Sequence, residues 1–587
     1  SIVTLPTPQR EGYTFGGWFT DADLSEACVN YQMPSNDINV YAWWTEENKP
    51  TDFVFSGEGQ YSISAYVGTQ TEMMIPAYIG GIPVTSIGYR AFYDVTNITK
   101  ASVPKTVESI GSGAFSSEAN ITEITIPFIG PKVDGGYHFG YIFAGSKGTS
   151  MNISGNTYII PSTLKKVTVT KQTFVPKNAF AECANFEEIV LPTNITTIGE
   201  NAFYHCSSLK QINIGNEVES IGEYAFYGCS SLTDIEVPQN TEIKDYAFDE
   251  TGIVKSKNGV IYIGGTLYKY NGTMPQNYTL NINEGTVVVN KYAFQGCSGL
   301  TNIIFPNSLK RIETNAFKDC TSLAELTIPN SLQKIGYQAF YGCNALTSVS
   351  IPFIGYELNS SEYFNVIFGK VPTKLANVKI TGSISKISAN AFSGCGNIKS
   401  VVLPDTVESI GENAFKGCAA LNSINIPDNV TEIGQYAFYG CSSLVDVTLP
   451  NKLTKLPSYC FYGCTKLETV QLPSSLEEIG QYAFQNCSSL KSIIIPSEVK
   501  VIGSHAFGGC TSLTSVTFNG EKLENIGSYA FQGCSTLSEI IISASVVMVG
   551  EYAFSECPNL VIKYKGLSIP TTWDYNWNVD ENTVEYV

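Results

Sequence analysis

The chain has 587 residues, 15% of them charged, and a formal net charge of −18. This acidic balance argues against direct binding to nucleic acid or anionic lipid, because both partners need a basic surface. No run of eighteen apolar residues occurs, so the sequence predicts no direct membrane insertion. A chain of this length normally divides into several globular domains unless it is built from repeats.

Residues 1–46 have a pattern of their own. It comprises Gly12, Tyr13, Phe15, Gly17, Trp18, Met33, Pro34, Tyr41 and Trp44. This pattern resembles the internalin-type B-repeat, also called the Listeria-Bacteroides repeat, a small β-grasp-like module of bacterial surface proteins. That family normally begins with a further strand, which is missing before Ser1. The resemblance therefore implies a partial β module in a fragment of a larger protein.

Residues 47–560 repeat one pattern, P-x-x-V-x-x-I-G-x-x-A-F-x-x-C-x-x-L-x-x-I-x-I, as in residues 404–426. Seventeen phenylalanines, from Phe92 to Phe554, occupy its F position, and most of them are 23 residues apart. One copy cannot bury its own apolar side chains, whereas stacked copies share a continuous core. The sequence therefore predicts a solenoid of about 20 coils, made mainly of short parallel β-strands with turns and short helical corners.

Three positions illustrate what we expect within a coil. The alternation of Ile424 and Ile426 with polar neighbours predicts a short, half-buried strand. Gly411 is expected to release the chain into a tight corner, because glycine tolerates unusual backbone angles. Phe415 is then expected to enter the interior from a short helical turn.

Fourteen of the sixteen cysteines, from Cys183 to Cys557, stand three residues after a repeat phenylalanine. We expect buried thiols that act as small apolar groups with a weak hydrogen-bond donor. Disulfides between neighbouring coils are the alternative, because the coil spacing allows them on distance alone. His138, His205 and His505 lack a metal-ligand pattern, so we expect ordinary surface or loop histidines, no metal site and no cofactor.

Insertions near 127–163, 251–285 and 352–375 interrupt the repeat, and residues 561–587 are expected to form a C-terminal cap. The first insertion contains a polar stretch at 145–156, and the second reads as a β-hairpin around a Gly-Gly pair. Irregular segments in a regular scaffold often carry function, although these could instead shield an edge. Their candidate ligand contacts are Tyr137, Phe139 and Tyr141 in the first insertion and Tyr363 and Phe364 in the third.

Two surfaces of the regular coils are further candidates. Side chains alternate along a strand, so the residues that flank its central apolar residue face outward. The candidate ligand contacts chosen from this ribbon are Asp234, Glu236, Asp446, Thr448 and Gln471. Rows of tyrosines next to the Ala-Phe pair, including Tyr204, Tyr224 and Tyr227, suit a sugar or a protein surface. The alternatives are a solvated sheet face for the ribbon and packing between coils for the tyrosines.

The repeat signature, from about residue 53 to 560, resembles the BspA-like (Treponema-type) leucine-rich repeat. The resemblance implies a secreted or cell-surface, adhesin-like protein of a host-associated microbe that binds a host or microbial surface protein or a glycan. It transfers no catalytic or cofactor-binding residue. A structural spacer that displays other modules is the alternative. An enzyme is a remote one, because the common nucleophile, zinc and phosphate-binding motifs do not occur.

Overall fold

The computed structural model describes residues 8, 13–19, 41–46, 50–133, 135–358 and 360–587. The chain forms two compact units, an N-terminal unit of residues 1–265 and a C-terminal unit of residues 266–587. The division lies within the second insertion, inside the region predicted as one solenoid. Strands predominate, and the helical segments of the described residues are η1 (Pro50–Asp52), η2 (Phe139–Ile142), α1 (Gly252–Lys255) and η3 (Phe364–Ile367).

The strands of the N-terminal unit form several small sheets. The antiparallel pairs are β1 (Tyr13–Phe19) with β2 (Tyr41–Glu46), and β13 (Thr149–Ile153) with β14 (Asn156–Ile160). The longest sheet contains β5 (Glu72–Met74), β8 (Lys100–Ser102), β11 (Glu123–Ile126), β15 (Lys166–Val169), β17 (Glu188–Val190) and β19 (Gln211–Asn213). Another contains β16 (Phe174–Val175), β18 (Thr197–Ile198), β20 (Ser220–Ile221) and β21 (Glu242–Ile243). The remaining strands are β3 (Phe53–Ser56), β4 (Tyr61–Tyr66), β6 (Tyr78–Ile79), β7 (Ile82–Ile87), β9 (Ser109–Ile110), β10 (Phe115–Ser116), β12 (Phe143–Ala144) and β22 (Gly259–Ile263).

The C-terminal unit contains two series of strands. The strands at the L-x-x-I-x-I positions are β24 (Tyr278–Asn281), β26 (Leu300–Ile304), β28 (Glu325–Thr327), β30 (Ser348–Ile351), β31 (Asn377–Ile380), β33 (Ser400–Val402), β35 (Ser423–Ile424), β37 (Asp446–Thr448), β39 (Thr469–Gln471), β41 (Ser492–Ile495), β43 (Ser515–Phe518), β45 (Glu539–Ile542) and β47 (Val561–Tyr564). The second series starts with β23 (Thr266–Asn271) and continues with β25 (Val288–Val289), β27 (Arg311–Ile312), β29 (Lys334–Ile335), β32 (Lys386–Ile387), β34 (Ser409–Ile410), β36 (Glu432–Ile433), β38 (Lys455–Leu456), β40 (Glu478–Ile479), β42 (Val501–Ile502), β44 (Asn525–Ile526) and β46 (Met548–Val549). Strand β48 (Thr583–Tyr586) follows in the C-terminal cap.

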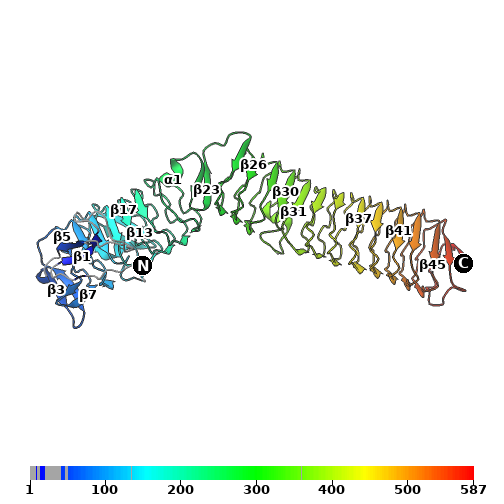
Figure 1. Ribbon diagram of the computed structural model, residues 1–587, viewed down its shortest axis with the longest axis horizontal. Helices are drawn as coiled ribbons and strands as arrows, with labels where there is room; N and C mark the ends of the chain where they lie inside the picture. The colour runs from blue at the N-terminus through cyan, green and yellow to red at the C-terminus, as the bar shows by residue number, and fades with distance from the viewer. Residues whose placement is uncertain (1–7, 9–12, 20–40, 47–49, 134, 359) are drawn as a thin grey trace, which may run out of the picture. The chain divides into compact units, whose positions relative to one another are not determined.

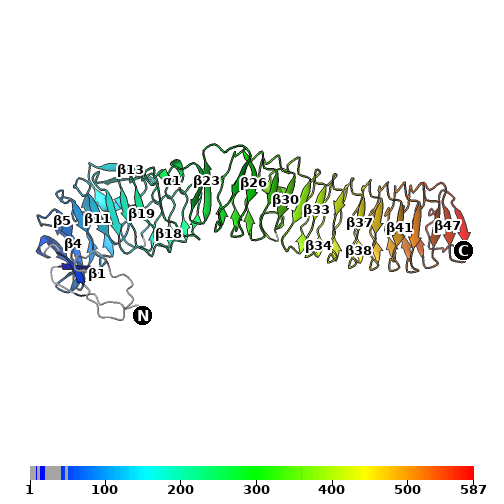
Figure 2. The same cartoon turned by 45° about the horizontal axis from the view of Figure 1, so that its top comes forward.

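Neighbouring coils pair in parallel and in register. Val447 in β37 pairs with Val470 in β39, and Leu456 in β38 pairs with Ile479 in β40, so each partner lies 23 residues further on. The β33 and β37 arrows therefore follow one another along one side of the C-terminal unit, and β34 and β38 follow one another along a second side (Figures 1 and 2). The predicted parallel solenoid is confirmed.

A column of phenylalanine rings fills the space between the two series of strands. The Phe438 ring lies 5.3 Å from that of Phe415 and 5.2 Å from that of Phe461, with interplanar angles of 1° and 3°. All three side chains are fully buried. The Phe415 amide also donates to the Ala437 carbonyl of the next coil at 2.8 Å. Each ring is therefore held both by its neighbours in the column and by its own backbone.

The cysteines lie beside this column as free thiols in the described part of the chain. The Cys441 Sγ donates to the Phe415 carbonyl of the preceding coil at 3.3 Å, and Cys464 bonds in the same way to Phe438 at 3.3 Å. Burial raises the pKa of the Cys441 thiol well above its usual range. The expectation of buried, weakly donating thiols is confirmed for the described residues, and Cys28 lies outside them.

The corners differ from the expectation in two respects. Phe415 lies in consecutive turns rather than a helical turn, and Gly411 does not adopt a left-handed backbone conformation. Glycine is required there because a Cβ on Gly411 would lie 2.6 Å from the Ala389 nitrogen of the preceding coil. The left-handed residue of this corner is Asn413, with a φ of 55°. Gly411 thus allows two coils to approach, and Asn413 turns the chain.

Both ends of the chain contain strands where they were expected. Strands β1 and β2 pair from Tyr13 with Glu46 to Phe19 with Tyr41, whereas Met33 and Pro34 of the expected module lie outside the described residues. At the other end, β48 adds in parallel to β47, and the buried Trp573 indole donates to the Val546 carbonyl at 3.2 Å. The C-terminal segment therefore extends the sheet and packs an aromatic residue against the last coils.

Phe438→Ala should lower the free energy of unfolding by about 3–5 kcal/mol, because the substitution removes ring contacts and leaves a cavity. Thr448→Ala, at an exposed strand position, should change it by less than about 0.5 kcal/mol. Urea denaturation followed by far-ultraviolet circular dichroism compares the two variants. Equal midpoints would contradict the buried position of Phe438.

Gly411→Ala should destabilise the protein by about 1–3 kcal/mol, because its methyl group would press on the backbone of the preceding coil. Gly396→Ala is the matched control, since the nearest atom to its Cβ would be 3.8 Å away. Thermal denaturation should lower the midpoint of the first variant only. A larger loss for the control would show that glycine at position 411 serves another purpose.

Candidate ligand-binding groove

The structure separates the aromatic candidates of the insertions into two groups. Tyr137 is 49% exposed and Tyr363 is 47% exposed, and the half-buried Tyr141 ring lies 5.1 Å from that of Tyr137. Phe139 and Phe364 are fully buried. Tyr137, Tyr141 and Tyr363 remain accessible, whereas the two phenylalanines have no surface with which to contact a ligand.

The two buried phenylalanines continue the phenylalanine column through the insertions. The Phe139 ring lies 5.5 Å from Phe143 and 5.3 Å from Phe180. The Phe364 ring lies 5.3 Å from Phe368 and 5.0 Å from Phe392. Each insertion must keep the core filled where it replaces the regular coil, and its phenylalanines do so. The prediction that Phe139 and Phe364 contact a ligand is therefore corrected.

The candidates on the strand faces are exposed, as expected, but they do not form one site. Asp234 and Glu236 belong to the N-terminal unit and flank Ile235 in a segment without a strand. Asp446, Thr448 and Gln471 belong to the C-terminal unit, where the Thr448 hydroxyl donates to the Gln471 side chain at 3.4 Å. These residues lie on the outer faces of regular coils and line none of the grooves described below.

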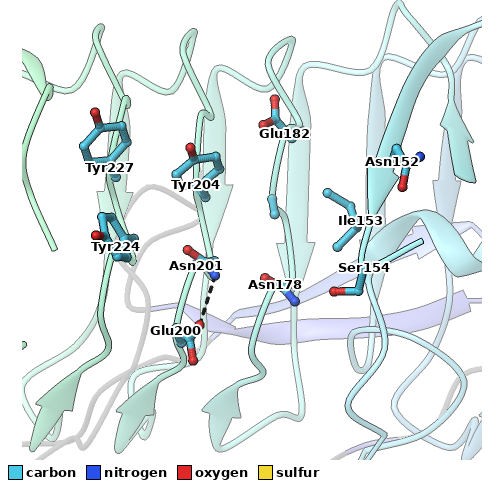
Figure 3. Close-up of a pocket in the computed structure, with 11 residues that line it drawn as sticks. Asn152, Ile153, Ser154, Asn178, Glu182, Glu200, Asn201, Tyr204, Tyr224 and Tyr227 are labelled. Carbon is cyan, nitrogen blue, oxygen red and sulfur yellow. Dashed lines mark hydrogen bonds between the residues drawn. The ribbon is translucent and has the colours of Figure 1, made fainter. Parts of the chain in front are cut away.

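A groove of about 530 Å³ lies in the N-terminal unit, where tyrosine rows meet the β13–β14 hairpin of the first insertion (Figure 3). We call it the tyrosine groove. It is lined by Asn152, Ile153, Ser154, Asn178, Ala181, Glu182, Glu200, Asn201, Tyr204, Tyr224 and Tyr227. It is open to solvent along one side, and its residues come from four successive segments of the chain. Three of its tyrosines were predicted as candidates from the sequence.

Left-handed corner residues place several of these side chains. Asn178, Asn201 and Tyr224 occupy the same position in three successive coils, with φ values of 57°, 54° and 54°. Asparagine tolerates this conformation well, whereas a bulky tyrosine in it is strained. Because the coils are in register, the three side chains form one column. The change from asparagine to tyrosine along this column gives the groove its aromatic end.

The tyrosines of the groove stack in two rows. Tyr204 and Tyr227 follow the repeat phenylalanine, and their rings lie 5.5 Å apart at 13°. Tyr224 precedes the repeat alanine and stacks on Tyr246 at 5.1 Å and 15°. Tyr224 also meets Tyr227 edge to face at 5.6 Å. Partial burial and, after it, the charge of Glu223 raise the pKa of the Tyr224 hydroxyl.

Acidic side chains line the groove beside the rings. The Glu182 carboxylate lies 3.2 Å from the His205 imidazole, and the Glu200 carboxylate lies 2.8 Å from the Lys177 ammonium. The Asn201 amide donates to Glu200 at 3.3 Å. A second depression, of about 460 Å³, adjoins the groove and shares Glu182 and Tyr227 with it. The region therefore offers aromatic surface together with many hydrogen-bond acceptors.

His138 attaches the first insertion to the coil beneath the groove. Its ring is buried, its Nε2 donates to the Ala181 carbonyl at 2.9 Å, and its Nδ1 accepts from the Gly140 amide at 3.0 Å. It also stacks on Tyr158 of β14 at 4.8 Å. Burial lowers the pKa of His138 to about 4, so the ring is neutral at pH 7. The expectation of an ordinary surface or loop histidine is wrong here, because the insertion folds over this residue.

Sequence reasoning missed most of the polar lining of the groove. Two signals were present: the polar stretch at 145–156, and the replacement of Asn201 by Tyr224 at one coil position. Neither shows that Asn152 and Ala181 lie in the same groove, because that depends on the path of the insertion. In the described residues, no group of three or more His, Cys, Asp or Glu side chains is arranged to hold a metal ion. None of the helices described is long and apolar enough to span a membrane.

Comparison with known proteins gives two family matches. The model for the BspA type Leucine rich repeat region matches residues 81–166, 152–274, 268–368, 365–491 and 477–564, as six copies. The model for the Listeria-Bacteroides repeat domain matches residues 1–43. No curated protein matches the chain.

Several solved structures resemble the chain at low identity. A leucine-rich repeat protein from Bacteroides ovatus is 21% identical, with 87% of this chain and 98% of that chain covered and a TM-score of 0.35. A leucine-rich repeat protein from Eubacterium ventriosum is 20% identical, with 66% and 85% covered and a TM-score of 0.29. A leucine rich cell surface protein from Faecalibacterium prausnitzii is 24% identical, with 80% and 93% covered and a TM-score of 0.22.

Acid should weaken the attachment of the first insertion through His138. The pKa of about 4 in the folded state lies below the ordinary value of 6.5, so the unfolded state binds the proton more tightly. This contribution to stability is complete above pH 6.5 and is lost as the pH falls towards 4. At pH 4.5 the loss should be about 2–3 kcal/mol relative to pH 7.

His138→Gln is the variant that isolates this effect, because glutamine keeps a donor and an acceptor but does not titrate. Urea denaturation at pH 7 and pH 4.5 should show a larger loss for the parent than for the variant. The other carboxylates titrate in both proteins and cancel in the comparison. Equal losses would show that His138 is not held neutral in the folded protein.

Proposed function

The chain belongs to the BspA-type leucine-rich repeat family, and on this premise we propose that it is a non-catalytic recognition protein that acts outside the cell and binds its ligand in the tyrosine groove. Proteins of this family and of the Listeria-Bacteroides repeat family are typically surface-exposed. Family membership is consistent with an extracellular role in protein interaction and with a scaffold that performs no catalysis.

The tyrosine groove is the observation that carries this proposal. Rings of Tyr204, Tyr224 and Tyr227 meet carboxylate and amide groups there, in an open groove (Figure 3). Tyrosine supplies a large apolar surface with a polar tip and is enriched at binding surfaces. The groove also coincides with an insertion, and insertions in regular scaffolds tend to carry function.

The surroundings of the groove favour binding over catalysis. Glu182 and Glu200 both pair with cationic or imidazole groups at the groove edge. Cys183, which lies beneath the groove, is fully buried, and burial raises the pKa of its thiol well above the usual range. A nucleophilic cysteine needs an accessible thiolate, so Cys183 is suited to a structural role.

A spacer that only displays other modules is the second candidate. The regular strand faces of the C-terminal unit favour it, because they are polar and solvated and their Lys–Glu pairs, such as Lys491 with Glu468, join neighbouring coils. A spacer would need no groove and no discrimination between ligands. The two functions therefore differ in whether a ligand depends on groove residues.

Binding of the purified chain to arrays of extracellular matrix proteins and oligosaccharides tests the proposal. We expect a ligand whose affinity falls roughly tenfold in Tyr227→Ala, because a central aromatic contact of about 1.4 kcal/mol is removed. Tyr462→Ala is the matched control, since Tyr462 occupies the same coil position in the C-terminal unit and stacks on Tyr439 at 4.8 Å. It should leave affinity unchanged.

Two results would contradict the proposal. Blank arrays for the folded parent protein would favour the spacer. A ligand that is equally sensitive to both substitutions would place recognition outside the groove. Labelling of intact source cells by an antibody against the chain should confirm the extracellular location, and labelling only after lysis would refute it.

A further inference from the structure

We propose that the ligand of the tyrosine groove is a neutral pyranose sugar that stacks on the open face of Tyr204. This inference rests on the proposed recognition function and names its ligand class. The argument starts from the rings, because a stacked tyrosine row normally covers its own faces. A flat ligand can use only a face that no neighbouring ring occupies.

One face of Tyr204 is covered by its neighbours. The Tyr227 ring lies 5.5 Å from Tyr204, and the His205 ring lies 4.1 Å from it. His205 and Tyr227 are only 5.8 Å apart, so both rings lie on the same side of Tyr204. The His205 ring also lies over Gly228 of the next coil, where a Cβ would come within 2.3 Å of it.

The opposite face of Tyr204 points towards the groove. In the preceding coil the position equivalent to Tyr204 is held by Ala181, so the row of rings ends there. Among the described residues no aromatic ring and no cation stacks on this face of Tyr204. Beyond Ala181 stand Ile153 and Ser154 of the insertion (Figure 3). A flat six-membered ring placed above Ala181 would continue the row, with Tyr204 on one side and the insertion on the other.

Row ends in the C-terminal unit are treated differently. Tyr436 and Tyr439 are the first aromatic residues of two stacked rows, and the Lys416 ammonium of the preceding coil lies 5.2 Å and 5.5 Å from their ring centroids. Lys318 covers Tyr341 in the same way at 5.6 Å. A lysine on the ring face satisfies it by a cation–π interaction and hinders other ligands. The Tyr204 face lacks this cover and is available.

The groove walls supply the polar groups that a sugar requires. The C–H groups of a pyranose carry partial positive charge and suit the negative face of an aromatic ring. Its hydroxyls need donors and acceptors at the groove edge, and the side chains of Asn178, Asn201, Glu182 and Ser154 are placed to provide them. This combination of a ring face and a few polar groups is typical of a small-ligand site.

The charges of the groove select a neutral sugar. Glu182 and Glu200 line it, Glu223 lies beside Tyr224, and the whole chain carries a formal charge of −18. A sialylated, uronic or sulfated sugar would meet repulsion from these carboxylates, and only Lys177 and His205 oppose them at the edge. A neutral hexose or N-acetylhexosamine avoids this cost. An acidic polypeptide is disfavoured for the same reason.

The experiment compares three variants of the full chain on one glycan array that contains neutral oligosaccharides and their sialylated and sulfated counterparts, with a matrix-protein array in parallel. Tyr204→Ala removes the ring face, and Tyr204→Phe keeps it. Tyr439→Ala removes a ring from the same coil position where Lys416 covers the row end. Thermal denaturation of each variant establishes that both units remain folded.

We expect the parent to bind neutral oligosaccharides in preference to acidic ones. Tyr204→Ala should weaken this binding roughly tenfold, whereas Tyr204→Phe and Tyr439→Ala should stay within about twofold of the parent. A preference for acidic glycans, or sugar binding insensitive to Tyr204→Ala, would overturn the inference. Groove-dependent binding to proteins alone would overturn it and leave the recognition function standing, and blank arrays on both sides would overturn both.

Discussion

The stacking of coils in register is the constraint on which the rest of the structure depends. Phe415 shows both of its components, a ring stacked on Phe438 at 5.3 Å and an amide bonded to the carbonyl of Ala437 at 2.8 Å. Both contacts require the next coil to place the same atoms one step further along the unit. A coil of a different length would break the column, so the insertions supply phenylalanines of their own. The fold is thus a sum of neighbouring contacts rather than one globular core.

Register also explains how one substitution changes the surface. Equivalent residues of successive coils form columns, so a run of tyrosines becomes a stacked row whose faces are hidden. Recognition surface arises where a row ends or an insertion stands beside it. Both occur at Tyr204, where Ala181 ends the row and the β13–β14 hairpin stands beyond it. At Tyr439 the row end is covered by Lys416 instead, so that end is a poor site for a flat ligand.

Much of the fold follows from the sequence because the period is so regular. The parallel strands, the buried phenylalanines and the thiols beside them all follow from the repeated spacing. The purpose of Gly411 did not, because only the structure shows the Ala389 nitrogen against it. The burial of Phe139 and the groove around Asn152 also depend on the three-dimensional path of an insertion, which has no repeat to define it. The tyrosine rows were visible in the sequence, but the open face of one ring was not.

The removal of coils tests the stacking account most directly. Deletion of residues 439–461 removes 23 residues and joins Phe438 to Tyr462, so the pattern continues without a change of register. Deletion of residues 439–450 removes about half a coil and shifts every following side chain. If stacking in register holds the C-terminal unit together, the first variant should unfold cooperatively in urea with a midpoint near that of the parent, and the second should lose its ordered C-terminal coils. Similar behaviour of the two variants would contradict the account.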